Sequence, residues 1–199
     1  QGVGFKCCLP KTAWPPTFEE GRLFDEHLFV ERRDGSLLML IRTLYGIAES
    51  RSTDGGQSWT PPQRSRLRGP GSRFALRRLK SGSLLLINHQ CGVPFSPVRE
   101  KLTAYLSDDD GESWTAGMMI DPRTGVSYPD FTEESNGAIL CVYDRDRYGD
   151  GEILLAEFTP DDVRKGVLPR PPQTISALRN RTGDNTEIPT TGEQIKELA

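Results

Sequence analysis

The sequence of 199 residues predicts an all-β protein, a β-propeller of which about three blades are present. Two octapeptides of the pattern Ser-x-Asp-x-Gly-x-Ser-Trp support this prediction, because each one encodes a tight turn after a strand-like run. A shorter motif recurs three times at intervals of about 50 residues and is typical of a β-hairpin. Helical periodicity is almost absent over the same region.

The two octapeptides span Ser52–Trp59 and Ser107–Trp114. Their Asp side chain bonds to nearby backbone and their Gly accepts a positive φ, so both residue types suit a tight turn. The Trp that ends each octapeptide then covers the turn with a large apolar ring. Two copies, each after a strand-like run, indicate a structural repeat.

The shorter motif is a small or charged residue, then Gly, then an apolar run, and its copies are Asp34–Leu38, Ser81–Leu85 and Asn136–Leu140. Each copy predicts a hairpin with an apolar strand on either side, such as the lead-in strands Leu28–Val30 and Phe74–Leu76. In the first two repeats a third strand leads to the octapeptide turn, and these strands are Ile47–Ser50 and Leu102–Leu106. Units of about four short strands are typical of propeller blades.

We expect the partial propeller within residues 1–168 and a polar linker or tail over residues 169–199. One helical turn is predicted at Thr159–Gly166 from its capping pattern. A closed propeller has at least about four blades, and only about three fit in this chain. We therefore expect further blades upstream of Gln1, so that the chain is part of a longer protein.

Composition argues against several classes of function. The chain has 25 Lys and Arg residues against 28 Asp and Glu, and its formal net charge of −3 speaks against general binding to nucleic acid or anionic membranes. No apolar run is long enough to span a bilayer, and the N-terminus lacks a signal-peptide pattern. No Cys and His residues have the spacing of a metal site, and we expect neither metal nor cofactor.

The repeat also predicts which side chains meet at the propeller axis. The residues nine positions before each repeat Gly stand at the starts of the lead-in strands and are Glu26, Arg73 and Tyr128. The residues seven positions after each repeat Gly stand at the ends of the strands that follow the turn and are Arg42, His89 and Asp144. Equivalent positions in successive blades occupy equivalent places around the axis, and strand starts and ends are adjacent across each hairpin. We therefore expect all six residues at one end of the propeller. Taken singly, each residue is better explained as an ordinary polar strand end, and only the set of six placed by one repeat favours a site.

Around these positions, the stretch of residues 24–162 resembles the sialidase superfamily, in which the octapeptide turns are called Asp-boxes. Glu26 before its hairpin and Arg42 at the hairpin's end are similar to a family segment with a catalytic Glu and a substrate-binding Arg. Arg99, before the second Asp-box, matches another family Arg, and Tyr128 matches the family's Tyr nucleophile. The resemblance implies a six-bladed propeller, with this chain as its C-terminal portion.

The resemblance further implies a retaining exo-sialidase that removes terminal sialic acid from glycoconjugates. A phenol is neutral until its proton leaves, so it can approach the carboxylate-bearing anomeric carbon without charge repulsion, and sialidases are the Tyr-dependent exception among glycosidases. In this interpretation Glu26 is the base that activates Tyr128. Arg42 and Arg99 would hold the substrate carboxylate with their planar guanidinium groups.

The remaining pocket positions have lesser expected roles: Arg73 as an additional anion-binding residue, and His89 and Asp144 as supporting residues. The family's first Arg and its Asp acid/base have no counterpart here, so activity of this chain alone is not implied. One alternative is a non-catalytic Asp-box propeller that binds glycan or protein. Another is a glycosidase for a related acidic sugar, because arginines suit any such carboxylate. The resemblance implies an extracellular or periplasmic location, which the sequence alone leaves open.

Overall fold

The computed structural model describes residues 26–43, 45–90 and 98–176. In these ranges twelve strands form three four-stranded antiparallel sheets, and one helix of six residues lies within the third blade. The all-β prediction and the prediction of three blades are both confirmed. Within each sheet the strands pair in chain order, so each blade is a simple meander.

The first sheet contains β1 (Leu28–Glu31), β2 (Leu37–Thr43), β3 (Gly46–Ser52) and β4 (Gln63–Arg64). The second contains β5 (Ala75–Arg78), β6 (Leu84–His89), β7 (Glu100–Ser107) and β8 (Met118–Thr124). The third contains β9 (Val126–Glu133), β10 (Ile139–Arg145), β11 (Glu152–Phe158) and β12 (Gln173–Ser176), with helix α2 (Pro160–Lys165) between its last two strands.

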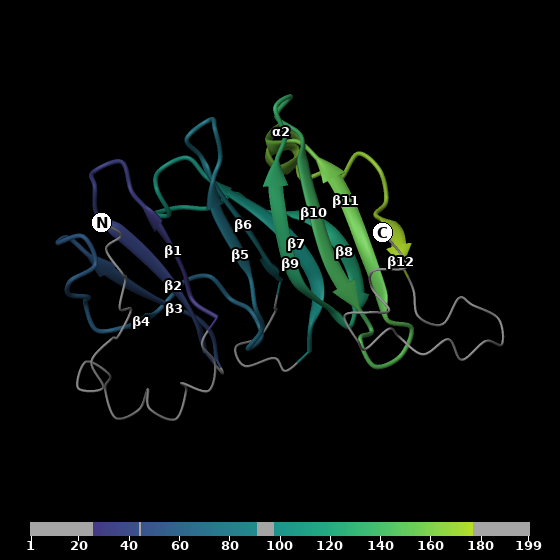
Figure 1. Cartoon of the computed structure of the whole chain (residues 1–199), viewed down its shortest axis with the longest axis horizontal. Helices are drawn as coiled ribbons and strands as arrows, with labels where there is room; N and C mark the ends of the chain where they lie inside the picture. The colour runs from purple at the N-terminus through teal and green to yellow at the C-terminus, as the bar shows by residue number, and fades with distance from the viewer. Residues whose placement is uncertain (1–25, 44, 91–97, 177–199) are drawn as a thin grey trace, which may run out of the picture.

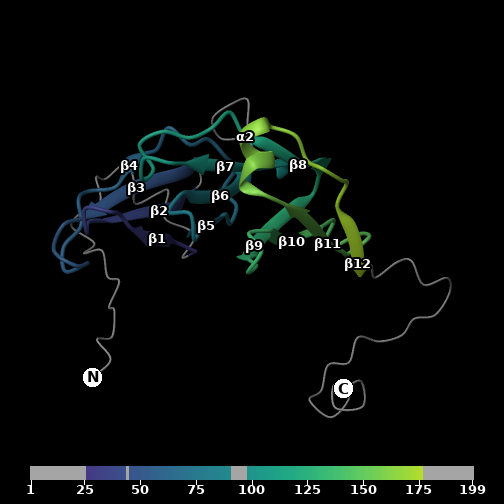
Figure 2. The same cartoon turned by 90° about the horizontal axis from the view of Figure 1, so that it is seen from above.

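The three sheets stand side by side along the chain (Figure 1) and fan out from β1, β5 and β9 (Figure 2). β5 contacts both β1 and β9, so the first strand of each blade is the strand nearest the common axis. This is the arrangement of neighbouring propeller blades. The starts of these strands are therefore the places where side chains from different blades can meet.

The core lies between the sheets. One apolar cluster joins the second and third sheets and includes Ile87, Leu102 and Phe158, whereas another joins the first and second sheets around Leu40 and Phe74. Strands β2 and β6 are buried on both faces, which explains their continuous apolar sequence. In the first two blades the second strand therefore packs against neighbouring parts of the protein on both of its faces.

Both Asp-boxes form the predicted turns. In the second Asp-box Ser113 N donates to Asp109 Oδ1 at 2.8 Å, and Gly111 N, at a φ of +90°, donates to Ser107 Oγ at 2.8 Å. The first Asp-box repeats this pattern. Hydrogen bonds from the serine side chain and backbone at the seventh position lower the pKa of Asp109 to about 2. The turn is therefore specified within eight residues, which is why the sequence reveals it.

The hairpin end of the sheets is tied together across blades. Asp110, of the second Asp-box, accepts a hydrogen bond from Arg33 N at 2.8 Å and pairs with Arg78 Nη1 at 2.8 Å. Arg33 lies in the first hairpin, and Arg78 also donates to Glu31 O at 2.6 Å. These contacts join the first sheet to the second at the end opposite the candidate site.

The C-terminal part combines an expected element with an unexpected one. Thr159 caps α2 in a reciprocal capping box with Asp162, and Gly166 ends the helix at a φ of +71°, as the sequence predicts. Residues 173–176 belong to the stretch predicted to be a polar tail, but in the structure they add β12 to the edge of the third sheet. This strand is exposed throughout and lacks alternation, so it carries no pattern by which to recognise it. Residues 177–199 of that tail lie outside the described residues.

Candidate active site

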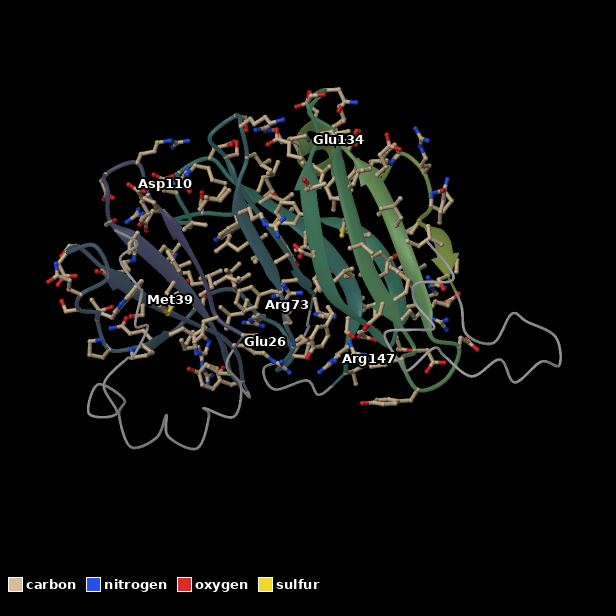
Figure 3. The ribbon with its side chains drawn as sticks, viewed as in Figure 1. Glu26, Met39, Arg73, Asp110, Glu134 and Arg147 are labelled. Atoms are coloured by element: carbon tan, nitrogen blue, oxygen red, sulfur yellow. The ribbon has the colours of Figure 1, made fainter. Side chains whose placement is uncertain are left out.

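Charged side chains from different blades gather at the end of the sheets opposite the Asp-boxes. Figure 3 shows Glu26, Arg73 and Arg147 toward this end, whereas Asp110 and Glu134 lie at the other. The three come from segments that precede β1, precede β5 and follow β10. The blade geometry therefore places residues distant in sequence around one part of the axis.

Glu26 and Arg42 form the first part of the site. Arg42 Nη1 forms an ion pair with Glu26 Oε2, and the Arg42 side chain is only 5% exposed. Its Nε and Nη2 donate to the carbonyl of Gly71 at 3.1 and 2.8 Å, in the segment that leads into the second blade. Glu26 is thus held in place by a guanidinium that is itself anchored to the neighbouring blade. No contact between Glu26 and Tyr128 is found in the described part of the chain.

Arg73 lies at the start of the second blade and turns toward the third. Its Nη2 is 3.9 Å from Asp130 Oδ2, a loose ion pair, whereas Arg77 Nη2 is 2.6 Å from Asp130 Oδ1. Arg73 is half-buried. A single carboxylate on β9 therefore serves two arginines, and Arg73 is the less tightly held of the two.

His89, opposite Arg73 across the hairpin, is fully buried. Its Nε2 lies 2.8 Å from the carbonyl of Val126, which can only accept, so this nitrogen carries the ring proton. Burial lowers the pKa of His89 to about 4, with the charge of Arg99 adding to the effect, while the bond to Val126 opposes it. His89 is therefore neutral at pH 7 and connects the second blade to the start of β9.

Tyr128 stands at a β-bulge. Asp130 pairs with Val142 and Ser127 pairs with Asp144, so Tyr128 and Pro129 together face the single residue Tyr143. Tyr128 has a φ of +52°, which is uncommon for a bulky side chain and costs on the order of 1 kcal/mol or more. The bulge shifts the register by one residue, so Asp144 pairs with Ser127, the residue before Tyr128. A bulge re-aims the side chain it carries.

Two arginines flank the Tyr128 ring. The guanidinium carbon of Arg147 is 4.4 Å from the ring centroid, and that of Arg99 is 5.7 Å away. Both distances lie within the range of favourable cation–π contact. Arg99, singled out from the sequence, therefore lies beside Tyr128, although 29 positions separate the two in the chain.

Asp144 supports this arrangement from the end of β10. It accepts a hydrogen bond from Ser127 Oγ at 2.5 Å and forms an ion pair with Arg147. The contact to Ser127 secures the residue before Tyr128, and the contact to Arg147 secures the cation above its ring. Asp144 thus acts on Tyr128 through its neighbours.

Sequence reasoning missed Arg147, Ser127 and Asp130. The spacing of three residues between Asp144 and Arg147 could have indicated a local ion pair. Only the bulge, however, brings that pair to the Tyr128 ring, and the bulge has no clear signal in the sequence. Asp130 receives its arginines from another blade, which no local pattern encodes.

The described ranges contain no group of three or more His, Cys, Asp or Glu side chains that could hold a metal ion. In the same ranges no helix has the length and apolar character needed to cross a bilayer.

The model of the BNR repeat-like domain family matches residues 26–141, which is more than half of the chain. The chain belongs to this family. The search of curated proteins finds no match. The matched region includes Glu26, Arg42 and Tyr128, and its repeats are the Asp-box blades described above.

Two solved structures have a similar fold. One is the intramolecular trans-sialidase from Ruminococcus gnavus in complex with oseltamivir carboxylate, at 24% identity and a TM-score of 0.55. The other is the leech intramolecular trans-sialidase in complex with 2,7-anhydro-Neu5Ac, at 18% identity and a TM-score of 0.58. Each match covers 70% of this chain but only 33% and 24% of the respective enzymes. The matched part of the chain therefore shares the fold of these two enzymes, and the chain spans about a third or less of their length.

Proposed function

We propose that this chain supplies the nucleophile side of a retaining exo-sialidase site, which acts on terminal sialic acid of glycoconjugates. The observation that carries the proposal is the position of Arg99 beside Tyr128, at 5.7 Å from its ring. No salt-bridge partner is found for Arg99 among the described residues. A substrate carboxylate on the carbon that Tyr128 attacks would be a natural partner for this guanidinium.

In the proposed reaction Tyr128 is the nucleophile and Glu26 takes its phenolic proton. The Tyr128 oxygen bonds to the anomeric carbon as the glycosidic bond breaks, and the leaving alcohol receives a proton from an acid. Water then cleaves the tyrosyl–sugar bond with retention of configuration. Glu26 pairs with Arg42 through Oε2, and in this proposal its other oxygen accepts the proton.

Arg42, Arg99 and Arg73 are the proposed carboxylate-binding residues. His89 and Asp144 keep the strand that carries Tyr128 in place, through Val126 and Ser127. The proposal also requires an acid/base carboxylate and a further arginine, and we propose that blades outside this sequence supply both. The fold of the two trans-sialidases supports this assignment of the superfamily without specifying the reaction.

The test is a Tyr128→Phe variant of the full-length protein, assayed with a fluorogenic sialoside. We expect turnover to be abolished and thermal unfolding to be nearly unchanged, because only the phenolic oxygen is removed. Tyr148→Phe is the matched control, since the Tyr148 side chain is 95% exposed and lies outside the site. The control should keep full activity.

Three results would contradict the proposal. Unchanged turnover in Tyr128→Phe would exclude Tyr128 as nucleophile. Binding of sialosides without turnover in the wild-type protein would favour the alternative of a non-catalytic glycan-binding propeller. Turnover of a related ulosonic acid but not of sialosides would indicate a glycosidase for another acidic sugar, to which the same arginines are suited.

A further inference from the structure

A groove of about 660 Å³ lies between the first and second sheets, on the side of their outer strands. Its walls come from β3, β4 and the segment after β4 on one side, and from β7 and the second Asp-box on the other. None of the residues assigned above to the candidate active site lines it. Its volume falls in the range that is usual for pockets of small ligands.

Arginines dominate the charge of this groove. Arg51, Arg64, Arg66 and Arg68 line it, against two glutamates. Along residues 64–68 the three arginines are exposed and the two residues between them are half-buried, so the arginines share the solvent-facing side. The local excess of positive charge contrasts with the net charge of −3 of the chain as a whole.

Both glutamates of the groove are already engaged. Glu112 accepts from Arg32 at 2.6 Å and from Arg51 at 2.9 Å, and the bond from Arg51 lowers the pKa of Glu112. Glu49 accepts a hydrogen bond from Ser65 Oγ. Within the described ranges no acidic side chain forms a salt bridge with Arg66 or Arg68. These two guanidinium groups are therefore the ones available to an anionic ligand.

Two aromatic rings complete the groove. Tyr105 and Trp114 are half-buried, and part of each ring packs against the apolar cluster between the first two sheets. The core thus holds both rings in place while the rest of each ring lines the groove. Rigid aromatic surfaces beside hydrogen-bonding side chains suit a ligand with both apolar and polar faces, as a sugar ring has.

We propose that this groove is a second carbohydrate-binding site, specific for an acidic oligosaccharide. Arg66 and Arg68 would bind its carboxylate or sulfate groups, and Trp114 and Tyr105 would contact its sugar rings. The shared chemistry is an anionic sugar, whether the charge comes from a sialic acid or from a sulfate. The site is independent of the candidate active site and does not require that Tyr128 be catalytic.

The test is calorimetric titration of the full-length protein with 3′-sialyllactose, with a sulfated glycosaminoglycan tetrasaccharide and with neutral lactose. The variants are the pair Arg66→Gln/Arg68→Gln, and Trp114→Phe. We expect at least one acidic sugar to bind and lactose to bind at least tenfold more weakly. The double variant should lose about tenfold or more in affinity for the acidic sugar, because two charge-assisted contacts are removed.

The control removes two positive charges elsewhere. Lys165→Gln/Arg170→Gln changes two exposed cations outside both sites, and it should bind like the wild type. Tyr128→Phe should also leave groove binding unchanged, whatever its effect on turnover, so failure of the enzymatic proposal is seen separately. Equal affinity in the wild type and in Arg66→Gln/Arg68→Gln, or equal affinity for lactose and the acidic sugars, would overturn the proposal.

Discussion

Lowering the pH from 7 to 4.5 should destabilise the fold through His89. This ring is fully buried, donates through Nε2 to Val126 O, and has its pKa lowered to about 4 from a reference of 6.5. As the pH falls below 6.5 the unfolded chain takes up a proton at this position, whereas the native protein does not until about pH 4. Proton uptake therefore favours unfolding across this window, and the free energy of unfolding falls.

The size of the effect follows from the shift. The lowering of the His89 pKa from 6.5 to about 4 contributes about 3 kcal/mol to the free energy of unfolding at high pH. About 2 kcal/mol of this contribution is lost between pH 7 and pH 4.5. Below about pH 4 the native ring is protonated as well, and this contribution to the pH dependence ends. Carboxylates also titrate in this range, so the comparison has to be made against a variant that lacks the imidazole.

His89→Gln is that variant, because its side-chain amide can donate to Val126 O and has no proton to gain. Urea unfolding of both proteins at pH 7, 5.5 and 4.5 gives the free energy of unfolding of each. The wild type should lose about 2 kcal/mol more than His89→Gln between the first and last pH. Parallel losses in the two proteins would refute the assignment of His89 as a buried neutral ring.

Three further predictions concern the turns and the ring of Tyr128. Gly46→Ala should destabilise by more than about 2 kcal/mol, because at a φ of +110° its Cβ would lie 2.6 Å from Gly69 O. Gly35→Ala, at +81° with nothing within 4 Å, should cost only about 1 kcal/mol, and equal melting temperatures for the two variants would contradict this. Asp110→Asn should lower the free energy of unfolding, measured in urea, by about 1 to 3 kcal/mol, because it removes the charge that pairs with Arg78. An unchanged unfolding midpoint would show that Asp110 does not stabilise the contact between the first two sheets. Arg147→Gln should lower kcat on a sialoside about tenfold with little change in KM, as expected of a positioning residue. The control Arg170→Gln should have no effect. A change in KM alone for Arg147→Gln would indicate that Arg147 binds substrate instead.

Much of the fold is predictable because its signals are local. Each Asp-box closes its turn with hydrogen bonds between residues two to four positions apart, and each hairpin glycine supplies a positive φ within its own turn. Continuous apolar runs indicate β2 and β6 as strands, and the structure shows both strands buried on both faces. The short or fully exposed strands β4 and β12 have neither kind of signal, and they form only because a neighbouring strand pairs with them.

The candidate site divides in the same way. Counting along the repeat selected Glu26, Arg42, Arg73 and His89. In the first two blades the first and second strands pair without a register shift, so the count applies to them directly. In the third blade the count selected Tyr128 and Asp144 but did not reveal the bulge opposite Tyr143, which brings Ser127 into register with Asp144.

The sequence by itself thus determined the repeat, the blades and the residues at their inner ends. Only the tertiary structure decided the left-handed backbone of Tyr128, the position of Arg147 over its ring and the sharing of Asp130 between Arg73 and Arg77. The physical reason is the range of the interactions. A turn is closed by atoms a few residues apart, whereas a bulge and an ion pair between blades depend on strands that meet only once the sheets have packed.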